Sequence, residues 1–133
     1  MKTTKELMVG DWVSVNGGMP MFVQDIYDNN TVYLDFEAWE EDIKNIEPIE
    51  ITRKILKDNG FKIGVAYSTL DIDSNKHFEY YHHEHRLRLW WEGIDEWENH
   101  SLVKSIIFQC HPFYVHELQH AFRLCKIDKE IVL

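Results

Sequence analysis

The chain has 133 residues and a formal net charge of −9, and 44% of its residues are hydrophobic. A chain of this length and hydrophobicity can bury a core, which excludes an intrinsically disordered protein and a large multidomain enzyme. The charge is concentrated in residues 1–50, where 11 acidic and 3 basic residues give −8. Nucleic-acid binding depends on Lys and Arg side chains that neutralise phosphates, so we expect a protein partner with a basic surface and no nucleic acid.

The N-terminal part of the chain contains three short segments rich in β-forming residues, separated by turns rich in Asn, Asp and Gly. These segments are Trp12–Val15, Met21–Tyr27 and Thr31–Phe36. Residues 39–46 fit a last short strand or a turn of helix equally well, and Pro48 ends the unit. Closing short strands into a barrel hides the edges of the sheet, so we predict a small acidic SH3-like β-barrel over residues 1–50.

Residues 51–133 are predicted to form a second sub-domain. Thr52 is a suitable N-cap and Gly60 a suitable C′ residue for a short helix between them. Alternating apolar residues then predict three antiparallel strands, at residues 61–69, 77–91 and 102–110. The apolar residues of the second strand change phase, and we attribute this change to a β-bulge around residues 82–86.

The last predicted element is a helix that begins near Pro112 and runs to about Cys125. Its apolar residues recur on one face, so we expect the helix to pack on the antiparallel sheet of the second sub-domain. The predicted fold class is therefore α+β, with an SH3-like barrel followed by a sheet and its C-terminal helix.

The composition also bears on location. No apolar run approaches the roughly 18 residues of a membrane span, and residues 1–11 lack the apolar stretch of a secretory signal. Two cysteines without such a signal are typical of buried thiols rather than a disulfide framework. We therefore expect a cytoplasmic protein that does not enter a membrane.

The C-terminal helix contains the sequence H-E-L-Q-H at residues 116–120. In zinc hydrolases with the H-E-x-x-H pattern, two histidines one helical turn apart bind the metal and the glutamate activates water. His116 and His120 share a helical face with Arg123, opposite the apolar stripe, and we expect that face to be exposed. An ordinary amphipathic helix can carry the same pattern on its solvent side.

A zinc hydrolase needs a third ligand, and the 13 residues after His120 contain no histidine. The remaining candidates are His82, His83, His85 and His111. We therefore favour a non-catalytic module without a cofactor, in which the acidic barrel and the C-terminal helix contact a protein partner. The alternative is a small zinc metallohydrolase, in which His116 and His120 bind the metal and Glu117 is the general base.

Three segments of the chain resemble a family of short uncharacterised proteins from gut Bacteroidales and their phages and mobile elements. They are residues 5–13, with G-D-W-V; residues 46–61, with E-P-I-E and N-G-F; and residues 114–120, Y-V-H-E-L-Q-H. The resemblance implies no catalytic residues. It implies an accessory or host-interaction role of the phage or mobile-element type, which agrees with a protein-interaction module.

Overall fold

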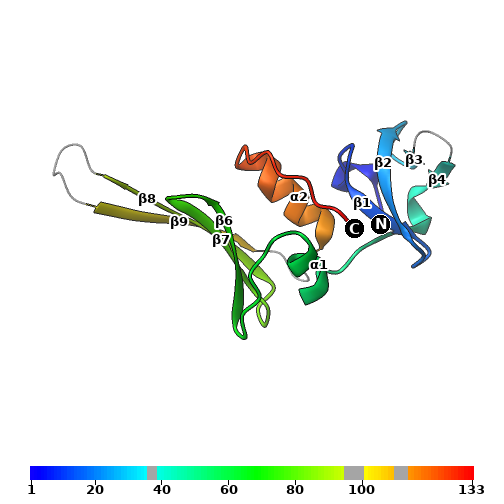
Figure 1. Cartoon of the computed structure of the whole chain (residues 1–133). Helices are drawn as coiled ribbons and strands as arrows, with labels where there is room; N and C mark the ends of the chain where they lie inside the picture. Colours follow the sequence, from blue (N-terminus) through cyan, green and yellow to red (C-terminus); the bar gives the residue numbers. More distant parts are fainter. Residues whose placement is uncertain (36–38, 95–100, 110–113) are drawn as a thin grey trace. The chain divides into compact units, whose positions relative to one another are not determined.

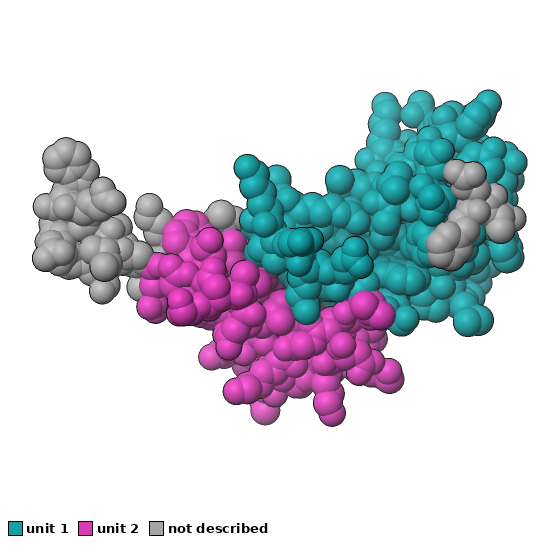
Figure 2. Space-filling view, turned by 45° about the horizontal axis from the view of Figure 1, so that its top comes forward, with its two compact units in different colours: residues 1–51, 114–131, 133 teal, residues 52–113, 132 magenta. Residues whose placement is uncertain are grey.

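The structure is a computed structural model that describes residues 1–35, 39–94, 101–109 and 114–133 (Figure 1). The chain is a mixed α+β protein with two antiparallel sheets, one of five strands and one of four. It divides into two compact units, coloured in Figure 2. Unit 1 comprises residues 1–51, 114–131 and 133, and unit 2 comprises residues 52–113 and 132.

The sheet of unit 1 has the strand order β4-β3-β2-β1-β5. Its strands are β1 Trp12–Val15, β2 Pro20–Ile26, β3 Thr31–Leu34, β4 Trp39–Asp42 and β5 Ile46–Pro48. A 3-10 helix, η1, at Thr4–Glu6 precedes the sheet, and a second, η2, at Ile43–Asn45 joins β4 to β5. The segment that fitted strand and helix equally well therefore contains both in succession.

The two edge strands of this sheet are β4 and β5, and no ladder joins them within the described residues. The described sheet is therefore not a closed barrel. The register between β2 and β3 shifts between Val23 and Asp25, which marks a bulge in β2. The core of the unit consists of aliphatic side chains: Leu7, Val13, Val23, Val32, Leu34, Ile43 and Ile46.

Unit 2 begins with the predicted short helix, α1, at Arg53–Asp58. The hydroxyl of Thr52 accepts a hydrogen bond from the backbone N–H of Ile55 (3.2 Å), as expected of an N-cap. Gly60 has a φ of +91°, a conformation that favours glycine at the end of a helix. Both predictions about the ends of α1 are confirmed.

The sheet of unit 2 has the order β6-β7-β8-β9. Its strands are β6 Tyr67–Asp73, β7 Lys76–Tyr81, β8 Arg86–Ile94 and β9 Ser101–Gln109. The prediction of one bulged strand over residues 77–91 is wrong, because β7 and β8 are separate strands that pair from Tyr81 with Arg86. A turn at residues 82–85, with His85 at a φ of +49°, joins them and accounts for the change in apolar phase.

The C-terminal helix, α2, spans Val115–Leu124. It belongs to unit 1, together with the N-terminal sheet, and not to the second sub-domain in which its sequence position predicted it. The backbone N–H of Val115 donates to the carbonyl of Ile49 (2.8 Å), and Tyr114 forms an antiparallel bridge with Glu50. The predicted start of the helix at Pro112, like Cys110, lies outside the described residues.

Among the described residues, no helix combines the length and the apolar character that crossing a membrane requires.

Candidate functional site

The polar face of α2 meets the turn that precedes β1, and both belong to unit 1. We call this group the Asp11 cluster; it consists of Asp11, His116, Gln119, His120 and Arg123. The expectation that the histidine face is exposed is wrong, since His116 and Gln119 are buried and His120 and Arg123 are half-buried.

Asp11 is the centre of the cluster and has no exposed surface. Its Oδ2 accepts hydrogen bonds from Nε2 of His120 (2.6 Å) and from the backbone N–H of Met8 (2.8 Å). Its Oδ1 accepts one from Nη1 of Arg123 (2.8 Å). A buried carboxylate needs a compensating charge and hydrogen bonds, and Arg123 with these donors supplies both.

Gln119 attaches the helix to the backbone on both sides of Asp11. Its Oε1 accepts from the N–H of Trp12 (2.9 Å), and its Nε2 donates to the carbonyl of Gly10 (3.0 Å). The indole N–H of Trp12 donates to the carbonyl of Ile131 (2.7 Å), so the segment after α2 is fixed to the same strand. The amide thus supplies partners that buried backbone groups otherwise lack.

Gly10 lets the turn approach the helix closely. Its φ is +92°, in the region that favours glycine, and a Cβ at this position would lie 3.1 Å from Nη2 of Arg123. The turn conformation favours glycine, and a Cβ would crowd the Arg123 guanidinium that Asp11 holds.

His116 is a buried member of the Asp11 cluster. Its ring stacks on that of Tyr114 (centroids 5.9 Å apart, 12° between planes) and meets the His120 ring edge-on at 5.5 Å. Burial lowers the pKa of His116 to about 4; the nearby Asp11 carboxylate opposes this shift and His120 adds to it. Its Nδ1 is buried without a hydrogen-bond partner, so the imidazole is neutral at pH 7.

The geometry also bears on the proposed zinc ligands. Because a carboxylate only accepts, Nε2 of His120 carries the hydrogen in its bond to Asp11, and that nitrogen has no lone pair for a metal. Among the described residues no group of three or more His, Cys, Asp or Glu side chains is arranged to hold a metal ion. Glu117, the proposed base, lies half-buried in the first turn of α2.

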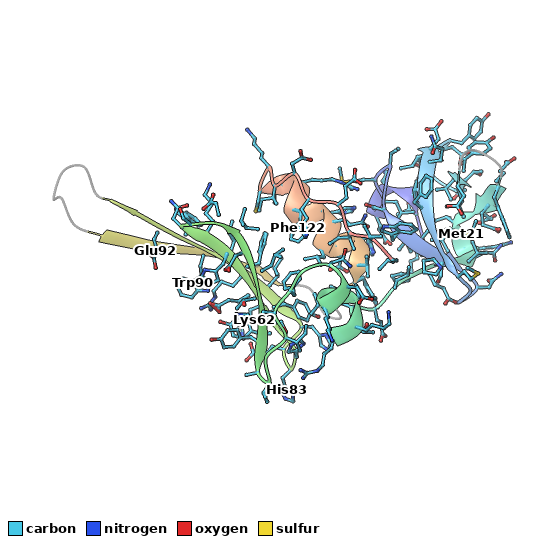
Figure 3. All side chains as sticks on the ribbon, viewed as in Figure 1. Met21, Lys62, His83, Trp90, Glu92 and Phe122 are labelled. Carbon is cyan, nitrogen blue, oxygen red and sulfur yellow. The ribbon has the colours of Figure 1, made fainter. Side chains whose placement is uncertain are left out.

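Four other histidines were proposed as a third ligand. His111 lies outside the described residues, and His82, His83 and His85 form the β7–β8 turn of unit 2. His83, labelled in Figure 3, is exposed, whereas Nδ1 of His85 lies 3.1 Å from the hydroxyl of Tyr80.

Nε2 of His82 lies 2.6 Å from Oγ of Ser68, a serine with no exposed surface. The N–H of Gly64 donates to the same Oγ (3.3 Å). Burial and then the nearby Arg53 and His85 lower the pKa of His82, which favours a neutral imidazole; its tautomer decides which partner donates in the hydrogen bond with Ser68. A serine beside a base is a pattern of nucleophilic catalysis, but this hydroxyl is out of reach of a substrate and serves to hold the turn.

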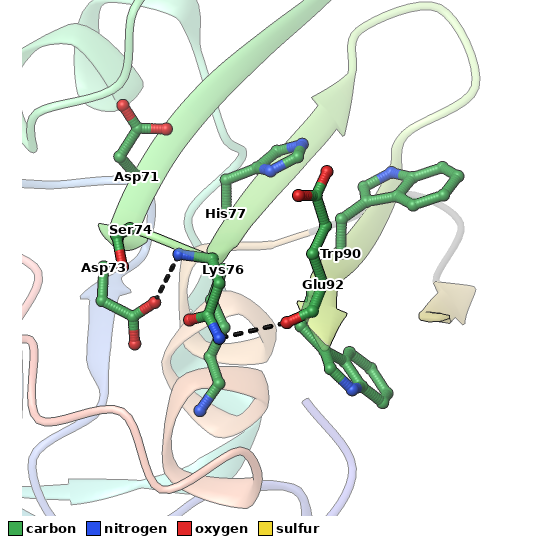
Figure 4. A pocket seen from close by; sticks show the side chains of 9 residues that line it. Asp71, Asp73, Ser74, Lys76, His77, Trp90 and Glu92 are labelled. Carbon is green, nitrogen blue, oxygen red and sulfur yellow. Dashed lines mark hydrogen bonds between the residues drawn. The ribbon is translucent and has the colours of Figure 1, made fainter. Parts of the chain in front are cut away.

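A small cavity of about 120 Å³ lies beside the β6–β7 turn of unit 2 (Figure 4). The side chain of Asn75 donates to the carbonyl of Glu92 (3.1 Å), and Oδ1 of Asp73 accepts from the Asn75 backbone (2.9 Å). Trp90 forms part of the lining, and the guanidinium of Arg88 lies 5.0 Å from its ring centroid. These interactions hold the hairpin, and the cavity is large enough for only a few water molecules.

The outer surface of β2, β3 and β4 in unit 1 combines carboxylates with tyrosines. We call it the acidic face; it consists of Asp25, Tyr27, Tyr33 and Glu40. Asp25 pairs with Tyr33 across β2 and β3, and Tyr33 pairs with Glu40 across β3 and β4, so the three form one cross-strand row. Tyr27 is 71% exposed and its ring meets that of Tyr33 edge-on, with centroids 6.3 Å apart.

Comparison of the chain with protein-family models, with curated proteins and with solved structures finds no match. The resemblance to the Bacteroidales and phage proteins therefore stays a prediction. Its three segments nevertheless have a structural relationship: parts of all three meet in unit 1. The G-D-W segment binds Gln119 of the H-E-L-Q-H segment, and the E-P-I-E segment binds the start of α2 through Ile49.

Proposed function

We propose that this protein is a non-catalytic interaction module that binds a basic segment of a partner protein through the acidic face of unit 1. The observation that carries the proposal is the row Asp25–Tyr33–Glu40 with the exposed Tyr27 beside it. Lys and Arg side chains can pair with the two exposed carboxylates and lie over an exposed tyrosine ring.

The charge of the chain supports this choice of partner. Residues 1–50 carry −8 of the total −9, so a basic partner would be attracted at long range and would associate faster at low salt. Contacts between exposed charges are weak one by one, and the affinity would fall as salt screens them.

An SH3-like fold for residues 1–50 is part of the proposal. Its support is the pairing of β1 with both β2 and β5, the bulge in β2, and the 3-10 helix between β4 and β5. An accessory role of the phage or mobile-element type and a cytoplasmic location, both expected from the sequence, belong to the same proposal.

The zinc hydrolase alternative has less support, because His120, one of its two proposed ligands, and Gln119 within the motif hold α2 on the turn before β1. Coordination through Nε2 of His120 would require the bond to Asp11 to break, and the buried Asp11 would lose one of its donors.

The test is a fluorescence-anisotropy titration of a labelled decapeptide of alternating lysine and alanine, at low and at physiological salt. An Asp25→Asn, Glu40→Gln variant should bind the peptide several-fold more weakly than the unmodified protein. An Asp71→Asn, Glu92→Gln variant, with the same change in charge on exposed residues of unit 2, is the matched control. Equal weakening in both variants would show that net charge alone attracts the peptide, and the acidic face would then have no specific role.

A further inference from the structure

A second surface of opposite charge lies on unit 2, beside α1. We call it the basic groove; its lining residues are Arg53, Lys54, Lys57, Phe61, Lys62 and Ile63, and its volume is about 670 Å³. Lys62 is labelled in Figure 3. Four of the six lining residues are cationic, although the chain as a whole carries −9.

The floor of the basic groove is apolar. Phe61 is 3% exposed and Ile63 is half-buried, so their side chains are fixed in the packing of unit 2. A floor of this kind accepts an alkyl or aromatic side chain by burial of apolar surface. Because the ring of Phe61 has little exposed surface, it does not offer the open face on which a nucleic-acid base stacks.

Most of the cations around this floor have no carboxylate partner within the described residues. Arg53 is held by carbonyl groups, since Nη1 donates to Gly64 (2.9 Å) and Nη2 to Val65 (3.3 Å). Of the four, only Lys54 forms a described ion pair, with Asp58 at 2.7 Å. The exposed Lys57 and Lys62 and the fixed guanidinium therefore leave positive charge around an apolar floor.

We propose that the basic groove binds an acidic peptide segment of a partner protein, with a bulky apolar side chain against the half-buried Ile63. Asp or Glu residues on both sides of that side chain pair with Lys57, Lys62 and Arg53. Charge complementarity argues for this occupant, because positive charge at a groove rim attracts carboxylates and the apolar floor adds affinity. The groove lies in unit 2 and is independent of the basic partner proposed for unit 1, so the module would join two partners of opposite charge.

The probe is a fluorescein-labelled heptapeptide with a central leucine and three glutamates on each side, titrated by anisotropy. We expect the unmodified protein to bind it and a Lys57→Glu, Lys62→Glu variant to bind about tenfold more weakly. A Lys2→Glu, Lys5→Glu variant has the same change in charge on exposed residues of unit 1 and should bind within about twofold of the unmodified protein. Replacing the leucine of the peptide by glycine should weaken binding several-fold.

Equal weakening in the two variants, or no binding of the leucine peptide, would overturn the proposal. Tighter binding of an oligothymidylate that competes with the peptide would assign the groove to nucleic acid instead. Sedimentation without peptide tests whether a second copy of this chain occupies the groove. A dimer of the unmodified protein that dissociates in the Lys57→Glu, Lys62→Glu variant would overturn the proposal of a separate partner. The Lys57→Glu, Lys62→Glu variant should still bind the lysine–alanine peptide through the acidic face. Binding of that peptide therefore tests the acidic face separately from the basic groove.

Discussion

Nε2 of His120 lies 2.6 Å from Oδ2 of Asp11, although 109 residues separate the two in the chain. The carboxylate is fully buried and is also bound by Arg123, so its charge is balanced by a residue of the same helix. The H-E-L-Q-H segment thus functions in this structure as one side of a tertiary contact.

Replacing Asp11 by Asn should destabilise unit 1. The change removes the negative charge that balances Arg123. It also places an amide N–H₂, which can only donate, where a carboxylate oxygen accepts hydrogen bonds from the donors around Asp11. Breaking a buried pair costs about 3–5 kcal/mol, and we expect about 2–3 kcal/mol because His120 and Arg123 are half-buried. Urea unfolding measures the loss. Glu6→Gln, at an exposed acid of the same unit, should change stability little, and an equal loss there would contradict a special role for Asp11.

Replacing Gly10 by Ala should cost about 1–3 kcal/mol, because a Cβ is strained at a φ of +92° and also crowds Arg123. Gly17→Ala is the matched control: its φ of +72° imposes a similar strain, but its Cβ would lie 3.4 Å from a flexible side-chain atom of Glu47. Thermal unfolding of both variants separates backbone strain from crowding. If Gly17→Ala proved the more harmful change, the close approach of the turn to α2 would be unimportant.

The buried His116 should make unit 1 sensitive to acid. Its folded pKa of about 4 lies below the unfolded value of 6.5, so protonation favours the unfolded state. The stabilisation is complete above pH 6.5 and is lost as the pH falls towards 4, by up to about 3 kcal/mol. Urea unfolding between pH 7 and 4 measures this slope. A His116→Gln variant should show a shallower slope, and an unchanged slope would assign the effect to groups other than His116.

Protein purified without chelator should contain well below one equivalent of zinc, because Nε2 of His120 is bonded to Asp11 and no group of three or more His, Cys, Asp or Glu side chains in the described part of the chain is arranged to hold a metal ion. Elemental analysis measures the content. A His116→Ala, His120→Ala variant distinguishes a built site from adventitious surface binding. Stoichiometric zinc that is lost in this variant would revive the metallohydrolase, with Glu117 as its base.

Local features of the fold could be predicted where neighbouring residues determine them. The Thr52 cap, the Gly60 end of α1 and the first strands follow from residue types at short range. The β7–β8 turn could not be predicted in this way, because residues 82–85 contain none of the usual turn formers Gly, Pro, Asn or Asp. His85 adopts a positive φ there because the pairing of Tyr81 with Arg86 closes the hairpin.

The candidate site was only partly predictable for a different reason. Helical spacing brought His116, His120 and Arg123 to one face, which the structure has. It could not show that Asp11 and Gly10 cover this face, because their contacts with α2 join positions more than 100 residues apart. Gln119 had no role in the metal pattern, yet it makes two of the hydrogen bonds that hold the helix.

Unit 1 is made from both ends of the chain, and unit 2, apart from Val132, is an insertion between Ile51 and Tyr114. During synthesis, unit 1 lacks α2 until the ribosome has passed residue 124, so the inserted unit can fold first. The bridge between Glu50 and Tyr114 brings the two ends of the insertion together. A short linker could therefore replace residues 52–113 and leave Asp11 and His120 to meet within one continuous small domain.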